Sequence, residues 1–229
     1  MGEGIGNDEA IMPFISSANI ACGFHAGDDI SMNKTILLAK KHGVAVGAHP
    51  SFFDRENFGR TEMQLSLNEI YDLVQKQIKL IKSIAAKHDV KLQHVKPHGA
   101  LYNMSAKDVT IANAIALAVR DYDTNLILVG LSGSQSVKEA FQLGLKTKNE
   151  VFADRTYQDD GSLTPRSQPN ALINDVAQAV EQTVQMIDKK EVTTISGKKI
   201  PVVAETICIH SDGEYAVEFA KAINKSLTR

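Results

Sequence analysis

The chain has 229 residues, of which 43% are hydrophobic and 6% aromatic, and it carries 25 Lys and Arg against 27 Asp and Glu. This composition is typical of a globular protein and excludes a disordered, collagen-like or disulfide-stapled chain. The net charge of −2, without long runs of one sign, argues against binding to nucleic acids or to membrane surfaces.

The sequence shows no segment for targeting to a membrane or for secretion. No apolar run approaches the roughly 20 residues that cross a bilayer. The opening residues, MGEGIGNDEA, lack the basic and apolar regions of a secretion signal. We therefore expect a cytoplasmic protein whose two cysteines, Cys22 and Cys208, are reduced thiols.

Short β-type runs alternate with longer segments of helical period along the chain. Most runs are continuously apolar, as expected for parallel strands buried on both faces. They cover residues 17–22, 44–48, 92–96, 126–129, 151–153 and 206–210. The alternation predicts a single domain over residues 1–229, built on a parallel sheet that is open or closed into a barrel.

Helices are predicted between these runs. Ser66 and Glu69 form a capping box ahead of an apolar stripe that continues to Ala85. Ser105 and Asp108 form a similar pair, which predicts that a second helix begins at Ser105. Two further helical segments lie at 32–40 and 172–187, and a β-hairpin is predicted near 192–203.

Five of the seven histidines lie at or just past the carboxyl ends of predicted strands. They are His25, His49, His94, His98 and His210. In parallel α/β folds, functional sites are built at this edge of the sheet. The histidines therefore predict a functional cleft there, although His94 can equally be a hydrogen-bonded core residue.

Charged residues accompany the histidines at the strand ends. Lys96, on a buried strand, is costly unless it meets an anion, which favours a role in substrate binding or catalysis. Asp154 and Arg155 follow another strand and form either a structural ion pair or a site for phosphate or carboxylate. A metal site built from His and Asp across several strand ends also stays open.

Common nucleotide and redox motifs are absent. The sequence contains no GxxxxGK[ST] loop, no GxGxxG after a strand and no CxxC. ATP or a dinucleotide is therefore not expected to be held by this chain in those ways.

Several strings resemble those of the LamB/YcsF family. They are SSANIACGFHAGD (16–28), VGAHPSF (46–52), FGR (58–60), HVKPHGALYN (94–103), EVFADRTYQDDGSLTPR (150–166) and TICIHSD (206–212). The resemblance covers nearly the whole chain in order. It implies an α/β fold, a (β/α)7 barrel of the glycoside hydrolase/deacetylase type.

The resemblance also implies a function. The chain would be one component of an ATP-dependent 5-oxoprolinase, which opens 5-oxo-L-proline to L-glutamate together with subunits B and C. ATP would be used by those partner subunits, and this chain would hydrolyse the activated lactam. Self-association into a homo-oligomer stays open.

Site residues are assigned on the same basis. Catalysis is assigned to Lys96, Asp154, His25 and His49, with Asp154 or a strand-end histidine accepting a proton from water. Substrate binding is assigned to Glu3, Arg60, His98, Tyr102, Arg155, Arg166 and His210. A divalent metal, if one is used, would be held among His25, His49, His94 and His98.

The start of the chain departs from the family pattern. Family members begin with a strand reading roughly (I/V)DLNxDxGE, and only Met1-Gly2-Glu3 matches its tail. We therefore expect a barrel that lacks its first strand. This leaves two alternatives to the lactam hydrolase: a metal-dependent deacetylase-like hydrolase, suggested by the strand-end histidines, and an inactive protein that only binds, suggested by the missing strand.

Overall fold

The core of the fold is a parallel sheet whose strands pair in chain order. In the computed structural model, which describes residues 1–228, the order is β1-β2-β3-β4-β5-β8. The strands are β1 (Ser17–Ala21), β2 (Ala45–His49), β3 (Leu92–Val95), β4 (Ile127–Leu131), β5 (Lys146–Phe152) and β8 (Thr206–Cys208). This arrangement confirms the predicted α/β fold with a parallel sheet.

Each predicted β run overlaps one of these strands. The largest difference is in β5, which begins at Lys146, whereas the apolar run begins at Val151. The first four residues of β5 alternate between exposed and half-buried positions, so they lack the continuous apolar pattern by which the other strands are recognised.

The segment ahead of β1 contains two short helical turns. These are α1 (Asp8–Ile11) and the 3-10 turn η1 (Met12–Phe14). The expectation that a strand preceding β1 is missing from the barrel stays a prediction, and so does the assignment of residues 1–229 to a single domain.

The chain divides into two compact units. The first comprises Met1–Gly130 with Ser134–Lys148, and the second comprises Leu131–Gly133 with Asn149–Arg229. None of the helices described within residues 1–228 combines the length and apolar character that a membrane crossing requires.

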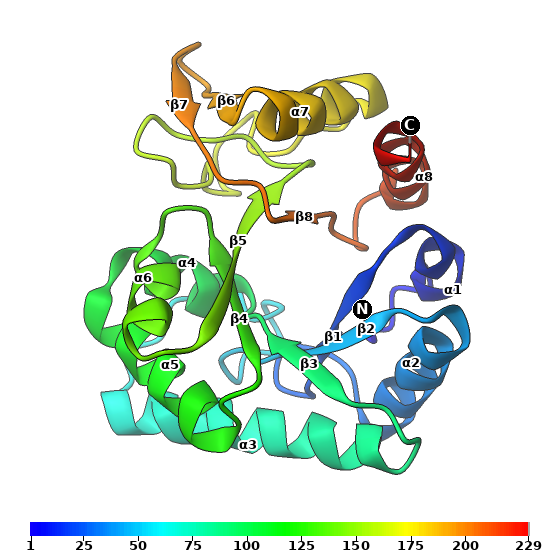
Figure 1. Ribbon diagram of the computed structural model, residues 1–229, viewed down its shortest axis with the longest axis vertical. Helices are drawn as coiled ribbons and strands as arrows, with labels where there is room; N and C mark the ends of the chain where they lie inside the picture. The colour runs from blue at the N-terminus through cyan, green and yellow to red at the C-terminus, as the bar shows by residue number, and fades with distance from the viewer. Residues whose placement is uncertain (229) are drawn as a thin grey trace. The chain divides into compact units, whose positions relative to one another are not determined.

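The first unit packs its helices against β1 to β4. These helices are α2 (Asp29–His42), α3 (Leu67–Ala86), α4 (Gly99–Lys107), α5 (Val109–Tyr122) and α6 (Gln135–Gln142). Helix α3 packs on β2 and β3 and contacts α2 and α5 on its two sides (Figure 1). The core between them is aliphatic, with Ile20, Ile36, Val46, Ile78 and Val95 almost fully buried.

Of two helix starts predicted from capping pairs, one is confirmed and one is wrong. The Ser66–Glu69 capping box is present at the start of α3, because each side chain bonds the other residue's backbone N–H. The predicted start at Ser105 is wrong, since Ser105 lies inside α4 and donates its hydroxyl to the Tyr102 carbonyl. Asp108 is the actual N-cap of α5 and accepts from the Thr110 and Ile111 amides.

The second unit pairs the end of β5 with β8 and adds two helices and a hairpin. The helices are α7 (Val176–Asp188) and α8 (Ala216–Leu227), which contact each other. Strands β6 (Glu191–Thr193) and β7 (Lys199–Pro201) pair antiparallel, at the place where the sequence predicts a hairpin (Figure 1). A small core of Ala153, Ile173, Ala179, Phe219 and Ile223 lies between these elements.

Helix α7 overlaps the predicted helical segment 172–187 and begins four residues later. Its buried face consists of Ala179, Thr183 and Met186, whereas the apolar Val184 is 38% exposed. The contacts of α7 with α8 and β6 set this face, and small residues there allow close approach. Leu172 lies outside the helix and is also exposed.

Candidate functional site

Three of the strand-end histidines converge in the first unit. His25 follows β1, His49 ends β2, and His98 follows β3 as the N-cap residue of α4. The rings of His25 and His98 stack, with centroids 3.9 Å apart, and His49 meets both rings edge-on. All three side chains are buried. The parallel strands thus bring together three residues of which the first and last, His25 and His98, are more than 70 positions apart in the chain.

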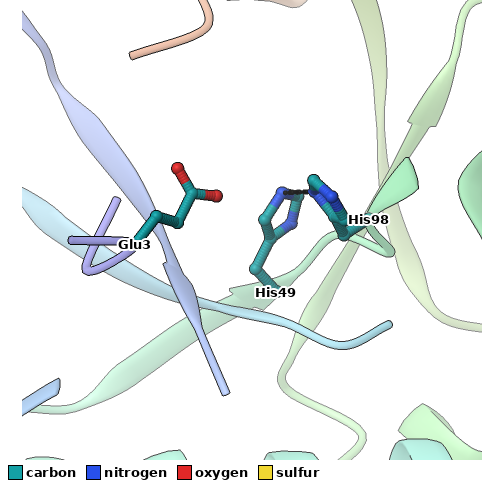
Figure 2. Close-up of side chains that lie close together, drawn as sticks. All are labelled: Glu3, His49 and His98. Atoms are coloured by element: carbon teal, nitrogen blue, oxygen red, sulfur yellow. Dashed lines mark hydrogen bonds between the residues drawn. The ribbon is translucent and has the colours of Figure 1, made fainter. Parts of the chain in front are cut away.

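Backbone carbonyls orient two of these rings. His49 donates from Nδ1 to the Lys96 carbonyl at 2.7 Å, and His98 donates from Nε2 to the Phe58 carbonyl at 2.8 Å. The remaining nitrogens, Nε2 of His49 and Nδ1 of His98, face each other at 3.0 Å (Figure 2). Burial, reinforced by neighbouring basic groups, holds the pKa of both imidazoles well below the usual value, so both rings are neutral at pH 7.

Glu3 lies beside this pair. A Glu3 carboxylate oxygen and one ring nitrogen each of His49 and His98 all lie within 4.8 Å of one another (Figure 2). Burial raises the pKa of the Glu3 carboxyl, but the N-terminal ammonium and a 3.3 Å hydrogen bond from His25 Nε2 outweigh it and keep the group ionised. Two neutral imidazoles and a carboxylate are a donor set that fits a divalent metal.

His94 is not part of this cluster. Its Nε2 lies 2.9 Å from Oδ1 of Asn19 on β1, and the ring packs over the backbone of Gly47 on β2. Burial lowers its pKa to about 4, so the ring is neutral. These contacts favour the core alternative for His94. Glu3 takes the place that the sequence assigned to His25 and His94 in a metal-binding set.

Lys96, which directly follows β3, lies next to Tyr102 of α4. The Lys96 side chain is buried, and its Nζ lies 5.5 Å from the centroid of the Tyr102 ring. The cation is thus held in a defined place, as a role in anion binding requires. Arg60 is exposed and stacks over the Phe58 ring at 4.9 Å.

The loop that carries Phe58 and Arg60 is ordered by its own side chains. Asp54 accepts from the backbone amides of Asn57 and Thr61, and Arg55 donates to the carbonyls of Gly23 and Gly27. The Asp54 contacts shape the loop itself, and the Arg55 contacts fix it against the segment that follows β1.

Gln77 on α3 supports the site, and it was not among the site residues predicted from the sequence. Its side-chain amide accepts from the Ser51 backbone N–H at 3.0 Å and donates to the Ser51 carbonyl at 2.9 Å. The Ser51 hydroxyl in turn lies 2.9 Å from His25 Nδ1. A fully buried Gln within the apolar stripe of α3, between Val74 and Ile81, was the available signal.

The second unit contains an Asp–His pair. Asp154 follows β5, His210 follows β8, and the Asp154 carboxylate accepts from both the backbone N–H and the Nδ1 of His210 at 2.9 Å. Burial raises the pKa of Asp154, but His210 and Arg155 outweigh it and lower the value to about 2. Asp154 is therefore a fixed anion that orients the His210 ring.

Arg155 and Arg166 lie on the long loop of this unit. The buried Arg155 guanidinium donates to the carbonyls of Ala171 and Thr164, so it ties the loop to the end of β5. These contacts give Arg155 a structural role beside the predicted one in substrate binding. Arg166 is half-buried in the turn that is closed by the bond from the Gln168 N–H to the Pro165 carbonyl.

We expect Asp154 to contribute to stability only above strongly acidic pH. Its folded-state pKa lies below the ordinary 3.8, so its contribution is present above about pH 4 and is lost as the pH falls towards about 2. The free-energy difference of unfolding between wild type and Asp154→Asn should therefore narrow over that interval. Urea unfolding at several pH values measures it, and a constant difference would contradict the assignment.

The sequence matches known proteins over its full length. The family model for LamB/YcsF matches residues 1–229. The A subunit of 5-oxoprolinase from Staphylococcus carnosus is 50% identical over 100% of this chain and 93% of its own length. That of Oceanobacillus iheyensis is 51% identical over 97% of this chain and 87% of its own length.

Solved structures agree with the fold. The crystal structure of a lactam utilization protein from Thermus thermophilus superposes with a TM-score of 0.91 at 42% identity, covering 100% of this chain and 93% of that one. A protein of Enterococcus faecalis named for cellobiose-phosphate cleavage has a TM-score of 0.57 at 11% identity, covering 98% and 88%, and shares the fold alone. The chain belongs to the LamB/YcsF family.

Proposed function

We propose that this chain is the A subunit of a 5-oxoprolinase and opens the lactam ring of 5-oxo-L-proline. The observation that carries the proposal is that relatives 50–51% identical over 97–100% of the chain are named as the A subunit of 5-oxoprolinase. The lactam utilization protein of Thermus thermophilus supports the same class of substrate.

Opening a five-membered lactam requires activation of a resonance-stabilised amide and a water nucleophile. In our proposal, subunits B and C transfer a phosphoryl group from ATP to the amide oxygen, and this chain hydrolyses the product. Water adds to the activated carbon, the ring C–N bond breaks, and the nitrogen gains a proton, which leaves an acyl phosphate. A second water molecule hydrolyses this acyl phosphate, and glutamate and phosphate are released.

His210 is the proton acceptor that we assign to this reaction. An Asp154 carboxyl with a pKa of about 2 is too weak a base at neutral pH. An imidazole whose Nδ1–H is held by a carboxylate presents Nε2 as the basic nitrogen. Of the two alternatives that the sequence left open, Asp154 or a strand-end histidine, our proposal takes the histidine, and Asp154 is then a positioning residue.

Lys96 is the anion-binding group that we assign to the substrate carboxylate. We expect Lys96→Met to raise KM for 5-oxoproline by about 10–100-fold, because a charge-assisted hydrogen bond contributes about 1.5–3 kcal/mol. Steady-state assays with subunits B and C measure the effect. Lys91→Met, at an exposed position just ahead of the same strand, is the matched control and should behave as wild type. Equal KM values for both variants would exclude the role.

A metal-dependent deacetylase-like hydrolase is the second candidate. The cluster of Glu3, His49 and His98 favours it, since two histidines and one glutamate hold the metal in several hydrolases. Such a metal would polarise a carbonyl; it does not choose between a lactam and an acetamide. The names of the relatives favour the lactam.

One assay separates the candidates. Purified chain is incubated with subunits B and C, ATP and 5-oxoproline, and in parallel with N-acetylated sugars alone, and glutamate and acetate are measured. Glutamate formation that requires this chain supports the proposal. Acetate release without partners or ATP supports the deacetylase, and the absence of both products supports an inactive protein that only binds.

A further inference from the structure

His49 and His98 face each other in a way that two neutral rings cannot satisfy. The Lys96 and Phe58 carbonyls can only accept, so His49 carries its proton on Nδ1 and His98 carries its proton on Nε2. In neutral rings, the two nitrogens that lie 3.0 Å apart are then both lone pairs. Two lone pairs at that distance repel unless an electrophile lies between or beside them.

The electrophile is either an added proton or a metal ion. An added proton would make one ring an imidazolium, although both rings are over 90% buried and Lys96 lies nearby. A buried imidazolium is costly because it loses the water that solvates its charge. A metal ion uses both lone pairs at once and leaves the two carbonyl hydrogen bonds intact.

The carboxylate of Glu3 completes the donor set. It faces the histidine pair (Figure 2), and one of its oxygens lies within 4.8 Å of a ring nitrogen of each histidine. We propose that Glu3, His49 and His98 bind one divalent transition-metal ion of the Zn²⁺ class. Imidazole donors favour such an ion over Mg²⁺ or Ca²⁺, which prefer oxygen ligands throughout.

The surroundings of the three ligands resemble those of known metal sites. Metal-bound histidines commonly donate their second N–H to a backbone carbonyl or a carboxylate, which fixes the tautomer that binds. Both histidines do so here, and His25 donates to Glu3 in the same way. The metal site is inferred from these contacts and distances, and it does not depend on whether the chain opens a lactam.

Zinc titration of the full chain tests the site. Chelator-treated protein is titrated with Zn²⁺ against a competing indicator, and bound zinc is counted by mass spectrometry. We expect one ion per chain, and affinity lower by at least about tenfold in Glu3→Gln, His49→Asn and His98→Asn. His42→Asn, which removes an exposed histidine at the end of α2, is the matched control and should bind as wild type.

A measurement on the wild-type chain covers the case in which a variant fails to fold. Imidazole ¹⁵N spectra with and without Zn²⁺ should show shifts at Nε2 of His49 and Nδ1 of His98, with Nδ1 of His49 and Nε2 of His98 still protonated. Unchanged spectra, or equal zinc affinity in all four variants, would overturn the site. Glutamate formation is measured in a separate assay, so the metal site and the lactam-opening activity can each be disproved without the other.

Discussion

Asp154→Asn is expected to lower kcat for 5-oxoproline opening by about 10²–10⁴-fold with little change in KM. The carboxylate accepts from the backbone N–H and from Nδ1 of His210, so it fixes both the position and the tautomer of the ring. An asparagine keeps the shape but can donate an amide N–H to Nδ1 of His210. This favours the tautomer that carries its proton on Nε2, the nitrogen that must accept a proton in the reaction. The expected range is that of general-base catalysis with an oriented histidine.

The measurement is a steady-state assay of glutamate formation with subunits B and C present. Asp188→Asn, at an exposed position at the end of α7, makes the same chemical change in the same unit and should retain wild-type kcat. A thermal unfolding curve for each variant shows whether the fold persists. A folded Asp154→Asn protein with wild-type kcat would remove the Asp–His pair from the mechanism.

Gly47→Ala should destabilise the first unit by about 3 kcal/mol or more. A Cβ at Gly47 would lie 2.0 Å from Nε2 of His94, within a buried sheet where neither group has room to move. Overfilling a packed core costs about 1–3 kcal/mol and more where the obstacle is rigid. Here the His94 ring is held by its contact with Asn19.

Urea unfolding measures this loss. Gly213→Ala is the control, because a Cβ there meets nothing within 4 Å and the backbone is in a region open to alanine. The double variant Gly47→Ala/His94→Ala should recover part of the stability, since the clash is removed from the other side. Additive losses in the double variant would show that the ring is not the obstacle.

The alternation of strands and helices could be predicted because its signals are local. Continuous apolar runs marked the strands, and the Ser66–Glu69 pair marked the start of α3. The same local signal failed at Ser105, where a matching pair lies inside a helix and Asp108 alone provides the cap. Both sites fit the capping pattern, and the surrounding contacts decide which one is used.

The gathering of histidines at the strand ends was also predictable, because parallel strands place their carboxyl ends at one edge. The roles of the individual residues were not. Whether His94 faces a ligand or the core depends on the space over Gly47 on the neighbouring strand. Gln77 reaches Ser51 only because α3 packs against β2.

Length, composition and charge thus determined the class of the protein, a globular chain of balanced charge, and the continuous apolar runs predicted its buried parallel strands. The family strings determined the relationship to 5-oxoprolinase subunits. The tertiary structure decided that Glu3 lies with His49 and His98, and that Asp154 holds His210. Such pairings join residues more than 40 positions apart, and their distances depend on the packing of whole strands and helices, which no local pattern encodes.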